Sequence, residues 1–242
     1  MRLKLMFKNE NSKNEIFLSK EYRSTFISYK KNVFNKSPLF DLLYGLEKKG
    51  CPFCSAVYFG KNMRIENEYI KISKSISLFF STGRFDIYSY FINGCMDFMN
   101  EEKEVLLKNA QRLKVTRIEP LPSRTIGEKI TIKTMSPFVL QNPGSDRKDF
   151  KNFYITAEHD CFENVLNEVT EKRMGYLGVK GFSQIKIKTN KSKIDQIPHY
   201  KGYVRATRGE FELKSSVETL QFLYDYGIGT RTGQLFGMFR IL

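Results

Sequence analysis

The chain has 242 residues, of which 41% are hydrophobic and 27% charged, and its 40 Lys and Arg against 26 Asp and Glu give a formal net charge of +14. This length allows one large domain or two small ones, and the hydrophobic content supports a packed core. No run of 18 or more apolar residues is present, so the sequence predicts no membrane-spanning helix. The excess of cations favours a polyanionic partner, either nucleic acid or an anionic membrane surface, over the alternative of a merely solvated basic surface.

The N-terminus and the cysteines indicate the compartment. Residues 1–7 alternate between polar and apolar side chains, as a strand does, and lack the apolar run and cleavage site of a signal peptide. We therefore expect a cytoplasmic protein that makes no membrane contact, with Cys51, Cys54, Cys95 and Cys161 reduced. Cys51 and Cys54 have the spacing of a metal or redox pair, but no second pair follows. A turn that holds two thiols is favoured over a zinc site, and we expect no metal or other cofactor.

The first half of the chain predicts strands and helices in a mixed order. Strands are expected at residues 2–7, 54–59, 68–73 and 76–81, and helices at 20–34, 37–50 and 85–99. Ser19 is the expected N-cap of the first helix, and Ser37 with Pro38 suits the start of the second. Residues 104–120 could continue a helix or form a hairpin. The alternation of Leu113 and Val115 favours the hairpin.

A boundary is predicted where Pro120 and Pro122 interrupt regular structure, between an N-terminal domain of residues 1–122 and a C-terminal domain of residues 123–242. Beyond it, strands are expected at residues 129–135, 184–188, 200–213 and 237–242, and helices at 161–173 and 216–226. Each half then repeats the order strand, helix, strand, strand, helix, strand. The predicted fold is α+β, with two tandem ferredoxin-like (RRM-like) domains built on antiparallel sheets.

The segment after the last predicted helix is rich in glycine and carries one arginine. Glycine lets main-chain N–H groups approach a phosphate closely, and a guanidinium adds a charge-assisted contact. The segment lacks the Gly-Lys-Ser/Thr of a Walker loop, and it runs from helix to strand, the reverse of a dinucleotide-binding fingerprint. The alternative is a glycine-rich turn with a purely structural role. The candidate RNA contacts here are Gly227, Gly229, Thr230, Arg231, Thr232, Gly233 and Gln234.

Three motifs carry a resemblance to a known family. The pattern Gly227-Ile228-Gly229, a polar insert and then Phe236-Gly237-Met238 resembles the glycine-rich signature of the CRISPR repeat-processing endoribonucleases of the Cas-six type, in the RAMP superfamily. Phe17-Leu18-Ser19 and Thr134-Met135-Ser136-Pro137 resemble two further motifs of that family in the same order, although Ser19 stands where proline is common. The resemblance implies two ferredoxin-like domains that recognise CRISPR repeat RNA (pre-crRNA). It also implies metal-independent cleavage that leaves a 2′,3′-cyclic phosphate, other CRISPR effector subunits as further partners, and a monomer or homodimer.

The catalytic groups depart from the family pattern. Many members carry a histidine between the first helix and the following strand, whereas His159 and His199 both lie in the second half here. Lysine, whose pKa is about 10.4, is a poor base but a good stabiliser of phosphate charge, and holding the 2′-hydroxyl in line supplies further acceleration. The candidate catalytic residues are Tyr29, Lys30, Lys31, Tyr44, Lys48 and Lys49. The alternatives are a core role for Tyr29, surface roles for Lys30 and Lys31, a helix-end role for Lys48 and Lys49, and a chain that binds repeats without cutting them.

Residues 182–214 combine cations with aromatic side chains, a pattern that suits unpaired bases and the backbone that carries them. The cations are Lys186, Lys188, Lys191, Lys193, Lys201, Arg205, Arg208 and Lys214, and only Asp195, Glu210 and Glu212 oppose them. We expect Lys186, Lys188, Arg205 and Arg208 to contact RNA. The alternatives are an edge hairpin whose lysines only prevent pairing with another chain, and an RNA-binding module unrelated to the CRISPR family.

Overall fold

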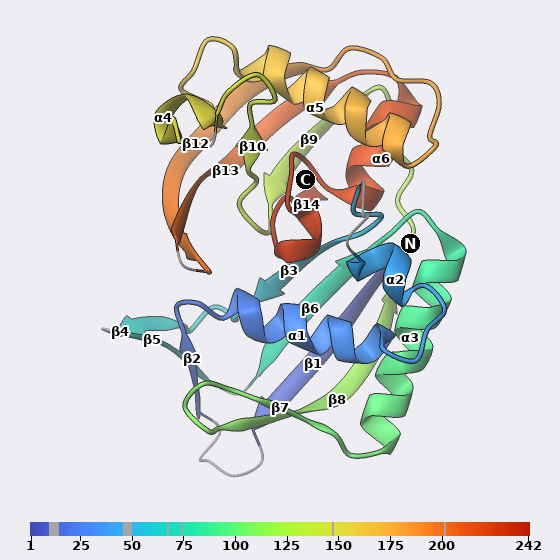
Figure 1. Ribbon diagram of the computed structural model, residues 1–242, viewed down its shortest axis with the longest axis vertical. Coiled ribbons are helices and arrows are strands. Elements are labelled where there is room, and N and C mark those ends of the chain that lie inside the picture. The colour runs from blue at the N-terminus through green and yellow to red at the C-terminus, as the bar shows by residue number, and fades with distance from the viewer. Residues whose placement is uncertain (10–14, 46–49, 67, 74, 147, 201) are drawn as a thin grey trace. The chain divides into compact units, whose positions relative to one another are not determined.

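A computed structural model describes residues 1–9, 15–45, 50–66, 68–73, 75–146, 148–200 and 202–242 (Figure 1). The chain divides into two compact units, one of Met1–Lys48 with Val57–Pro122 and one of Lys49–Ala56 with Ser123–Leu242. The predicted N-terminal domain of residues 1–122 therefore includes a segment, Lys49–Ala56, that belongs to the other unit. No helix among the described residues is both long and apolar enough to cross a membrane.

The N-terminal half of the chain forms a five-stranded sheet in the order β3-β6-β1-β8-β7 and a three-stranded sheet in the order β2-β5-β4. Its elements are β1 (Arg2–Asn9), β2 (Glu15–Ser19), α1 (Arg23–Phe34), α2 (Phe40–Tyr44), β3 (Cys54–Tyr58), β4 (Arg64–Glu66), β5 (Tyr69–Ser73), β6 (Ile76–Ser81), α3 (Phe85–Asn100), β7 (Glu104–Leu106) and β8 (Arg112–Leu121). Strand β1 pairs antiparallel with both β6 and β8. The hairpin predicted over residues 104–120 is confirmed, because β7 pairs with β8.

The core of this unit follows from the alternation of β1. Leu3, Leu5 and Phe7 point to one face of the sheet and are fully buried, as expected for a strand with period two. Phe7 packs edge-on against Phe26 and Tyr29 of α1, with ring centroids 5.5 and 5.2 Å apart. Helices α1 and α3 lie over the five-stranded sheet (Figure 1). Burying each large apolar side chain contributes about 2 kcal/mol, so this face holds the unit together.

The start of the first helix differs from the prediction. Residue Ser19 ends β2 and is not an N-cap; its hydroxyl oxygen accepts the N–H of Glu21 at 3.2 Å. Helix α1 begins at Arg23, with Tyr22 as a cap that makes no side-chain hydrogen bond. Helix α2 is also shorter than predicted, because Ser37 caps only the turn before it, accepting the N–H of Leu39 at 3.1 Å.

The second unit has a four-stranded sheet in the order β12-β13-β9-β14, the ferredoxin-like order. Its elements are β9 (Lys129–Thr134), β10 (Leu140–Gln141), α4 (Phe150–Phe153), β11 (Tyr154–Ile155), α5 (Phe162–Tyr176), β12 (Lys186–His199), β13 (Gly202–Lys214), α6 (Val217–Tyr226), the 3-10 turn η1 (Thr232–Gln234) and β14 (Phe239–Ile241). The predicted fold class, two tandem ferredoxin-like units with antiparallel sheets, is confirmed. The sequence did not predict β10, α4 and β11, and β12 is much longer than the strand expected at 184–188.

Strands β12 and β13 form a long two-stranded ribbon that is buried on opposite faces at its two ends. Near its start, Phe211 and Leu213 pair with the core residues of β9 and pack under α5 and α6. Towards its turn, Val204 and Ala206 are buried on the other face, in a cluster with Phe236. This second cluster places the turn of the ribbon beside the segment that follows α6.

Candidate nucleic-acid interface

Some of the cations on the ribbon of β12 and β13 lie in ion pairs, and others do not. Three of the four predicted RNA contacts are engaged by acids: Lys186 lies 3.0 Å from Glu163, Arg208 lies 2.7 Å from Asp195, and Arg205 lies 4.0 Å from Glu158. The remaining contact, Lys188, has no ion pair within the described residues, and Lys191 and Lys193 share this property. Lys201 lies outside the described residues.

The exposed lysines Lys188, Lys191 and Lys193 of β12 lack close ion pairs among the described residues, and the register gives a reason for Lys188 and Lys191. Lys188 stands opposite Glu212 in the register and Lys191 opposite Glu210. Both glutamates already bind lysines of β9, with Lys129 3.0 Å from Glu212 and Lys133 2.6 Å from Glu210. The hydrogen bond from Lys133 lowers the pKa of Glu210 below its ordinary value. The central strands are therefore neutralised, and positive charge remains on the edge strand.

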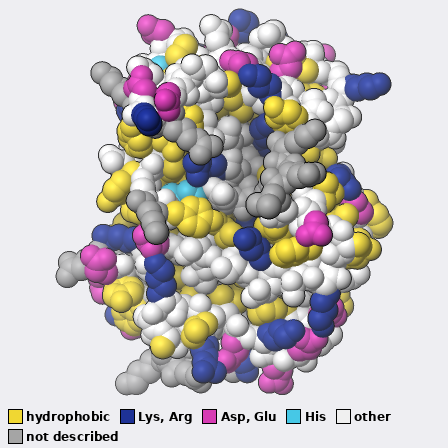
Figure 2. Space-filling view, viewed as in Figure 1, with side chains coloured by type: hydrophobic (Ala, Val, Ile, Leu, Met, Phe, Trp, Pro, Cys, Tyr) yellow, Lys and Arg dark blue, Asp and Glu magenta, His cyan; other side chains and the backbone are white. Residues whose placement is uncertain are grey.

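Charge alone does not mark this surface. On the face of the molecule visible in Figure 2, Lys and Arg side chains are interspersed with Asp and Glu and do not gather in one patch. What distinguishes Lys188, Lys191 and Lys193 is their spacing along a single exposed strand. A row of cations of this kind suits a nucleic-acid backbone.

The glycine-rich loop, residues 227–237, is packed into the second unit. The amides of Gly227, Ile228, Thr230 and Gln234 donate to carbonyl oxygens of the protein at 2.7–2.8 Å. These donors are therefore not available to a phosphate, and Gly229, Thr232 and Gly233 are buried. For Gly227, Thr230 and Gln234, this corrects the prediction that the main-chain amides of the loop face RNA. The side chains of Thr230, Arg231 and Gln234 are half-buried and remain candidates for contact.

The glycines of this loop are required by backbone geometry and close packing. Gly229 has φ of +76°, and a Cβ there would lie 2.3 Å from the carbonyl oxygen of Val139. Residues that have a Cβ rarely adopt a positive φ of this size in any environment. A Cβ on Gly233 would lie 2.5 Å from Sγ of Cys51. The glycine pattern that resembles the family signature thus builds the loop's shape.

A buried arginine holds the start of the loop. Arg173, on the inner face of α5, donates to the carbonyl oxygens of Gly227 at 2.6 Å and Tyr226 at 2.8 Å. It also lies 3.4 Å from Oγ1 of Thr232, which donates in turn to the carbonyl oxygen of Phe53 at 3.0 Å. Burial lowers the pKa of Arg173 to about 10, so the guanidinium stays charged at neutral pH. Arg173 was not among the predicted site residues, although a cation four positions after Val169 on an apolar stripe indicates a buried role.

Three side chains meet where the ribbon turn reaches the loop. Nε2 of His199 lies 2.8 Å from Oε1 of Gln234, and a guanidinium nitrogen of Arg231 lies 3.4 Å from the same oxygen. The imidazole is 7% exposed and packs edge-on against Phe236 and Tyr200. His199 therefore joins the end of β12 to the loop through Gln234.

Two of the predicted catalytic residues are buried. Tyr29 is 2% exposed and Lys30 is 0% exposed. The hydroxyl of Tyr29 donates to Sγ of Cys95 at 3.3 Å, and burial raises the pKa of Tyr29 well above its ordinary value. Neither side chain can meet a phosphate at the surface, so the predicted roles of both are wrong. Lys30 is buried because it lies four residues after Phe26 and three before Val33, on the inner stripe of α1.

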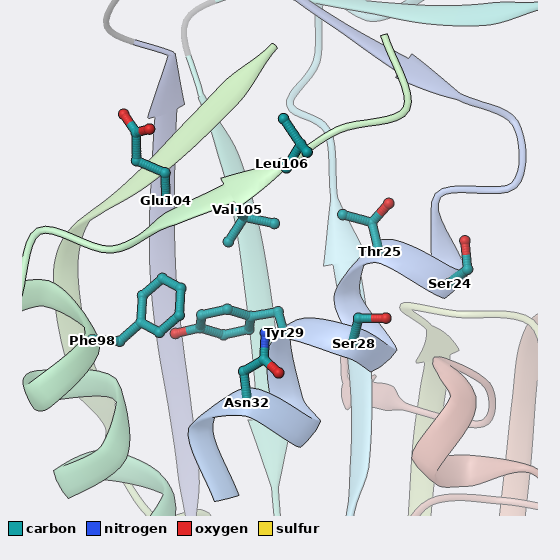
Figure 3. Close-up of a pocket in the computed structure, with 9 residues that line it drawn as sticks. All are labelled: Ser24, Thr25, Ser28, Tyr29, Asn32, Phe98, Glu104, Val105 and Leu106. Carbon is teal, nitrogen blue, oxygen red and sulfur yellow. The ribbon is translucent and has the colours of Figure 1, made fainter. Parts of the chain in front are cut away.

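A pocket of about 360 Å³ lies beside Tyr29, between α1, α3 and β7 (Figure 3). Its walls include Ser24, Ser28 and Asn32 of α1 and Glu104 of β7. None of the described residues that line it is Lys or Arg. A site without a cation and with a carboxylate is a poor place for a phosphate, so this pocket is not the candidate interface.

Lys31 and Tyr44 are the predicted catalytic residues that the structure brings together. Nζ of the exposed Lys31 lies 5.6 Å from the ring centroid of Tyr44, within the range of a cation–π contact. The half-buried ring of Tyr44 also packs against Phe40 and Phe34. The other two candidates, Lys48 and Lys49, lie outside the described residues.

Three of the four cysteines, Cys51, Cys54 and Cys95, act as packing groups, whereas Cys161 is exposed. Cys51 is half-buried and donates to the carbonyl oxygen of Phe53 at 3.4 Å, whereas the buried Cys54 lies 3.8 Å from the carbonyl oxygen of Asp225. Burial raises the pKa of Cys95 to about 12. Across the described ranges, no three or more His, Cys, Asp or Glu side chains come together as a metal site.

Comparisons with known proteins agree with this architecture. The family described as CRISPR associated protein Cas6, C-terminal, matches residues 119–241, just over half of the chain. Among solved structures, a Cas6-related protein from Pyrococcus furiosus is 21% identical with a TM-score of 0.84, over 100% of this chain and 98% of its own. A RAMP protein described as binding different RNA substrates is 19% identical with a TM-score of 0.86, over 100% and 99%. A Cas6 product complex is 14% identical with a TM-score of 0.66, over 100% and 99%. Comparison with curated proteins gives no match.

Tandem ferredoxin-like units, with a glycine-rich loop between the last helix and the last strand, place the chain in the ferredoxin-like class of α+β proteins. The extent of the family match makes the assignment more specific. The chain belongs to the Cas6 family of CRISPR-associated proteins, and the resemblance found in the sequence is confirmed.

Proposed function

We propose that this protein binds CRISPR repeat RNA through its second unit and cleaves that RNA without a metal ion. Three findings support this proposal: membership of the Cas6 family, a protein of the same fold described as binding different RNA substrates, and a Cas6 product complex of the same fold. The proposal of RNA binding rests on the row of lysines without ion pairs on β12. Lys188, Lys191 and Lys193 stand on one exposed strand, and the acids opposite Lys188 and Lys191 are neutralised by β9.

The RNA-binding surface includes the ribbon and the half-buried side chains of the loop. Lysines on β12 neutralise successive phosphates, while Arg231 and Gln234 supply directional hydrogen bonds. Tyr200 and Tyr203 are 58% and 56% exposed, so each offers a ring on which an unpaired base can stack. Single-stranded or loop nucleotides are the expected ligands, because stacking needs bases outside a helix.

For cleavage, the 2′-hydroxyl loses its proton to water and attacks the adjacent phosphate. The bond to the 5′-oxygen breaks, that oxygen takes up a proton from water, and a 2′,3′-cyclic phosphate forms. Lys31 neutralises charge that develops on the phosphate. The ring of Tyr44, whose hydroxyl is buried, holds the Lys31 ammonium in place. Positioning and charge stabilisation of this kind suit a slow, single-turnover enzyme.

A cleavage assay tests the catalytic half. Labelled repeat RNA is incubated with protein in EDTA, and products are examined for a 2′,3′-cyclic phosphate. We expect Lys31→Ala to slow cleavage by about 100- to 1,000-fold, as for loss of one charge-stabilising group. The matched control is Lys36→Ala, which removes an exposed lysine that lies 3.4 Å from Glu101. Cleavage by Lys31→Ala at the wild-type rate removes this lysine from the mechanism.

Salt dependence tests the binding half. The pair Lys188→Ala and Lys193→Ala should lower the slope of log affinity against log salt by about 1.4, at about 0.7 per phosphate contact on a single strand. The control pair is Lys172→Ala and Lys180→Ala, exposed cations at α5 and in the loop after it. If both pairs change the slope equally, the ribbon is not the binding surface.

A second candidate function is repeat-RNA binding without cleavage. The observation that favours it is the absence of histidine from residues 1–158, together with the burial of Tyr29 and Lys30. The same assay separates the two functions. Tight binding with no cyclic-phosphate product, at any time and with every repeat tested, identifies a binder.

A further inference from the structure

The contact between His199 and Gln234 lies among unusually strained backbone conformations. Five non-glycine residues in the described part of the chain have positive φ, and three of them are Tyr200, Arg231 and Leu235, at 53°, 58° and 68°. These three flank the contact in sequence on both sides. Bulky side chains are rarely found in this conformation, and strain of this kind gathers at ligand sites.

The donors at this contact fix the orientation of the Gln234 amide. A guanidinium can only donate hydrogen bonds, so the atom of Gln234 that faces Arg231 at 3.4 Å is the carbonyl oxygen. Nε2 of His199 faces the same oxygen at 2.8 Å and therefore carries the proton. Oε1 is thus occupied from two sides.

The amide nitrogen of Gln234 is left to bind a ligand. It has no hydrogen-bond partner among the residues that the structure describes. Gln234 is half-buried, so this group can meet a ligand without leaving its position. With its oxygen engaged, the side chain offers donors only, and Arg231 beside it also offers donors only.

Two neighbouring donors match two neighbouring acceptors on a base. Guanine presents N7 and O6 side by side, whereas adenine presents N7 beside an amino donor. A free glutamine pairs with adenine through both its oxygen and its nitrogen, but here the oxygen is already engaged. Tyr200 packs against the same imidazole, with ring centroids 4.6 Å apart, and its exposed ring can stack on the bound base.

We infer that Gln234 and Arg231 form a subsite for one unpaired guanine of the bound RNA, and that His199 is a positioning residue which keeps the Gln234 amide in its donor-only orientation. The inference rests on the proposed RNA-binding function and assigns it a base preference. It predicts discrimination between guanine and adenine that does not depend on the phosphate contacts of the ribbon.

The test measures equilibrium binding of short uridine oligoribonucleotides that carry one central guanosine, adenosine, cytidine or 7-deazaguanosine. Wild-type protein should bind the guanosine oligomer about tenfold more tightly than the adenosine oligomer, the order expected for one paired base contact. The 7-deazaguanosine oligomer, which lacks the N7 acceptor, should lose most of this preference. This comparison uses only wild-type protein, so it does not depend on the folding of any variant.

Variants then assign the preference to residues. Gln234→Ala should bring the ratio of the guanosine and adenosine dissociation constants to about one, while the salt slope stays unchanged. His199→Ala frees Oε1 and should lower the ratio by admitting adenine, an effect that a purely structural histidine would not have. Gln184→Ala, a glutamine exposed just before β12, is the matched control and should keep the wild-type ratio.

The outcomes separate this inference from the proposed function. Equal affinity for the guanosine and adenosine oligomers, or for the guanosine and cytidine oligomers, overturns the guanine subsite and leaves RNA binding intact. Failure of every oligomer to bind overturns both. A tenfold preference that survives in Gln234→Ala overturns the residue assignment.

Discussion

Replacing Arg173 with methionine tests whether one buried guanidinium holds the glycine-rich loop. Methionine retains an unbranched apolar stem but donates no hydrogen bond. The carbonyl oxygens of Tyr226 and Gly227, which receive the guanidinium at 2.8 and 2.6 Å, would lose that donor. The contact with Thr232, at 3.4 Å, would be lost as well.

Two opposing contributions to the free energy of unfolding set the size of the expected loss in Arg173→Met. Hydrogen bonds from a charged donor contribute about 1.5–3 kcal/mol each, so the two short ones together contribute about 5 kcal/mol. Burial lowers the pKa of Arg173 to about 10 from 12.5, which corresponds to a cost of about 3 kcal/mol that the methionine variant no longer carries. We therefore expect the free energy of unfolding of the second unit to fall by about 2 kcal/mol. Arg173→Lys, which keeps a charged donor, should lose less.

Two measurements check this expectation. Urea unfolding can be followed by circular dichroism, since the chain has no Trp, and hydrogen exchange reports the amides of residues 227–230 directly. The control is Lys172→Met on the exposed side of α5, where an ion pair with Glu168 is worth only about 0.5 kcal/mol. If Arg173→Met exchanges its loop amides at the wild-type rate, the arginine does not hold the loop.

Three further predictions follow from backbone strain, burial and titration. Gly229→Ala should lower the free energy of unfolding by more than about 1 kcal/mol, because it combines a positive φ with a backbone clash. The control Gly175→Ala in α5, where a Cβ meets nothing, should raise the free energy of unfolding by about 0.5–1 kcal/mol. Equal urea midpoints for the two variants would contradict this account. Tyr29→Phe should cost about 1 kcal/mol of stability through its lost hydrogen bond and leave RNA cleavage unchanged; a large loss of rate would restore Tyr29 as a catalytic group. The hydrogen bond from the N–H of Ile187 lowers the pKa of Glu163 below its ordinary 4.5. Wild type should therefore be more stable than Glu163→Gln well above pH 4.5, and this difference should disappear as the pH falls through the lowered pKa. A stability difference that is constant with pH would refute this prediction.

The sequence predicted the elements whose side chains follow a simple period. Leu3, Leu5 and Phe7 alternate along one strand, and the apolar stripe of α3 repeats with helical spacing, so both were found. Prediction from the period of apolar side chains failed at Lys30. It occupies the same stripe as Phe26, but its charge suggested an exposed position, and only the packing of the whole helix places the ammonium inside.

The candidate site was harder to predict because its residues come together through tertiary pairing. The second half of β12 is a strand because β13 pairs with it, and the run from Lys191 to Asp195 carries almost no apolar signal of its own. The glycine motif was found, but its role was misjudged, since spacing alone cannot tell whether an amide faces solvent or a carbonyl oxygen. The contact of His199 with Gln234 joins residues 35 positions apart, and no local sequence pattern predicts it.

The segment Lys49–Ala56 has a consequence for how the protein can be divided. This piece of the N-terminal sequence supplies the carbonyl oxygen of Phe53 that receives the hydroxyl of Thr232, and the thiol of Cys51 that fills the space against Gly233. A fragment that starts at Ser123 would lack both, and transplanting the C-terminal half onto another protein would require this early peptide to travel with it. During synthesis the peptide leaves the ribosome long before Thr232 does, so the second unit assembles its loop only after Thr232 has been made.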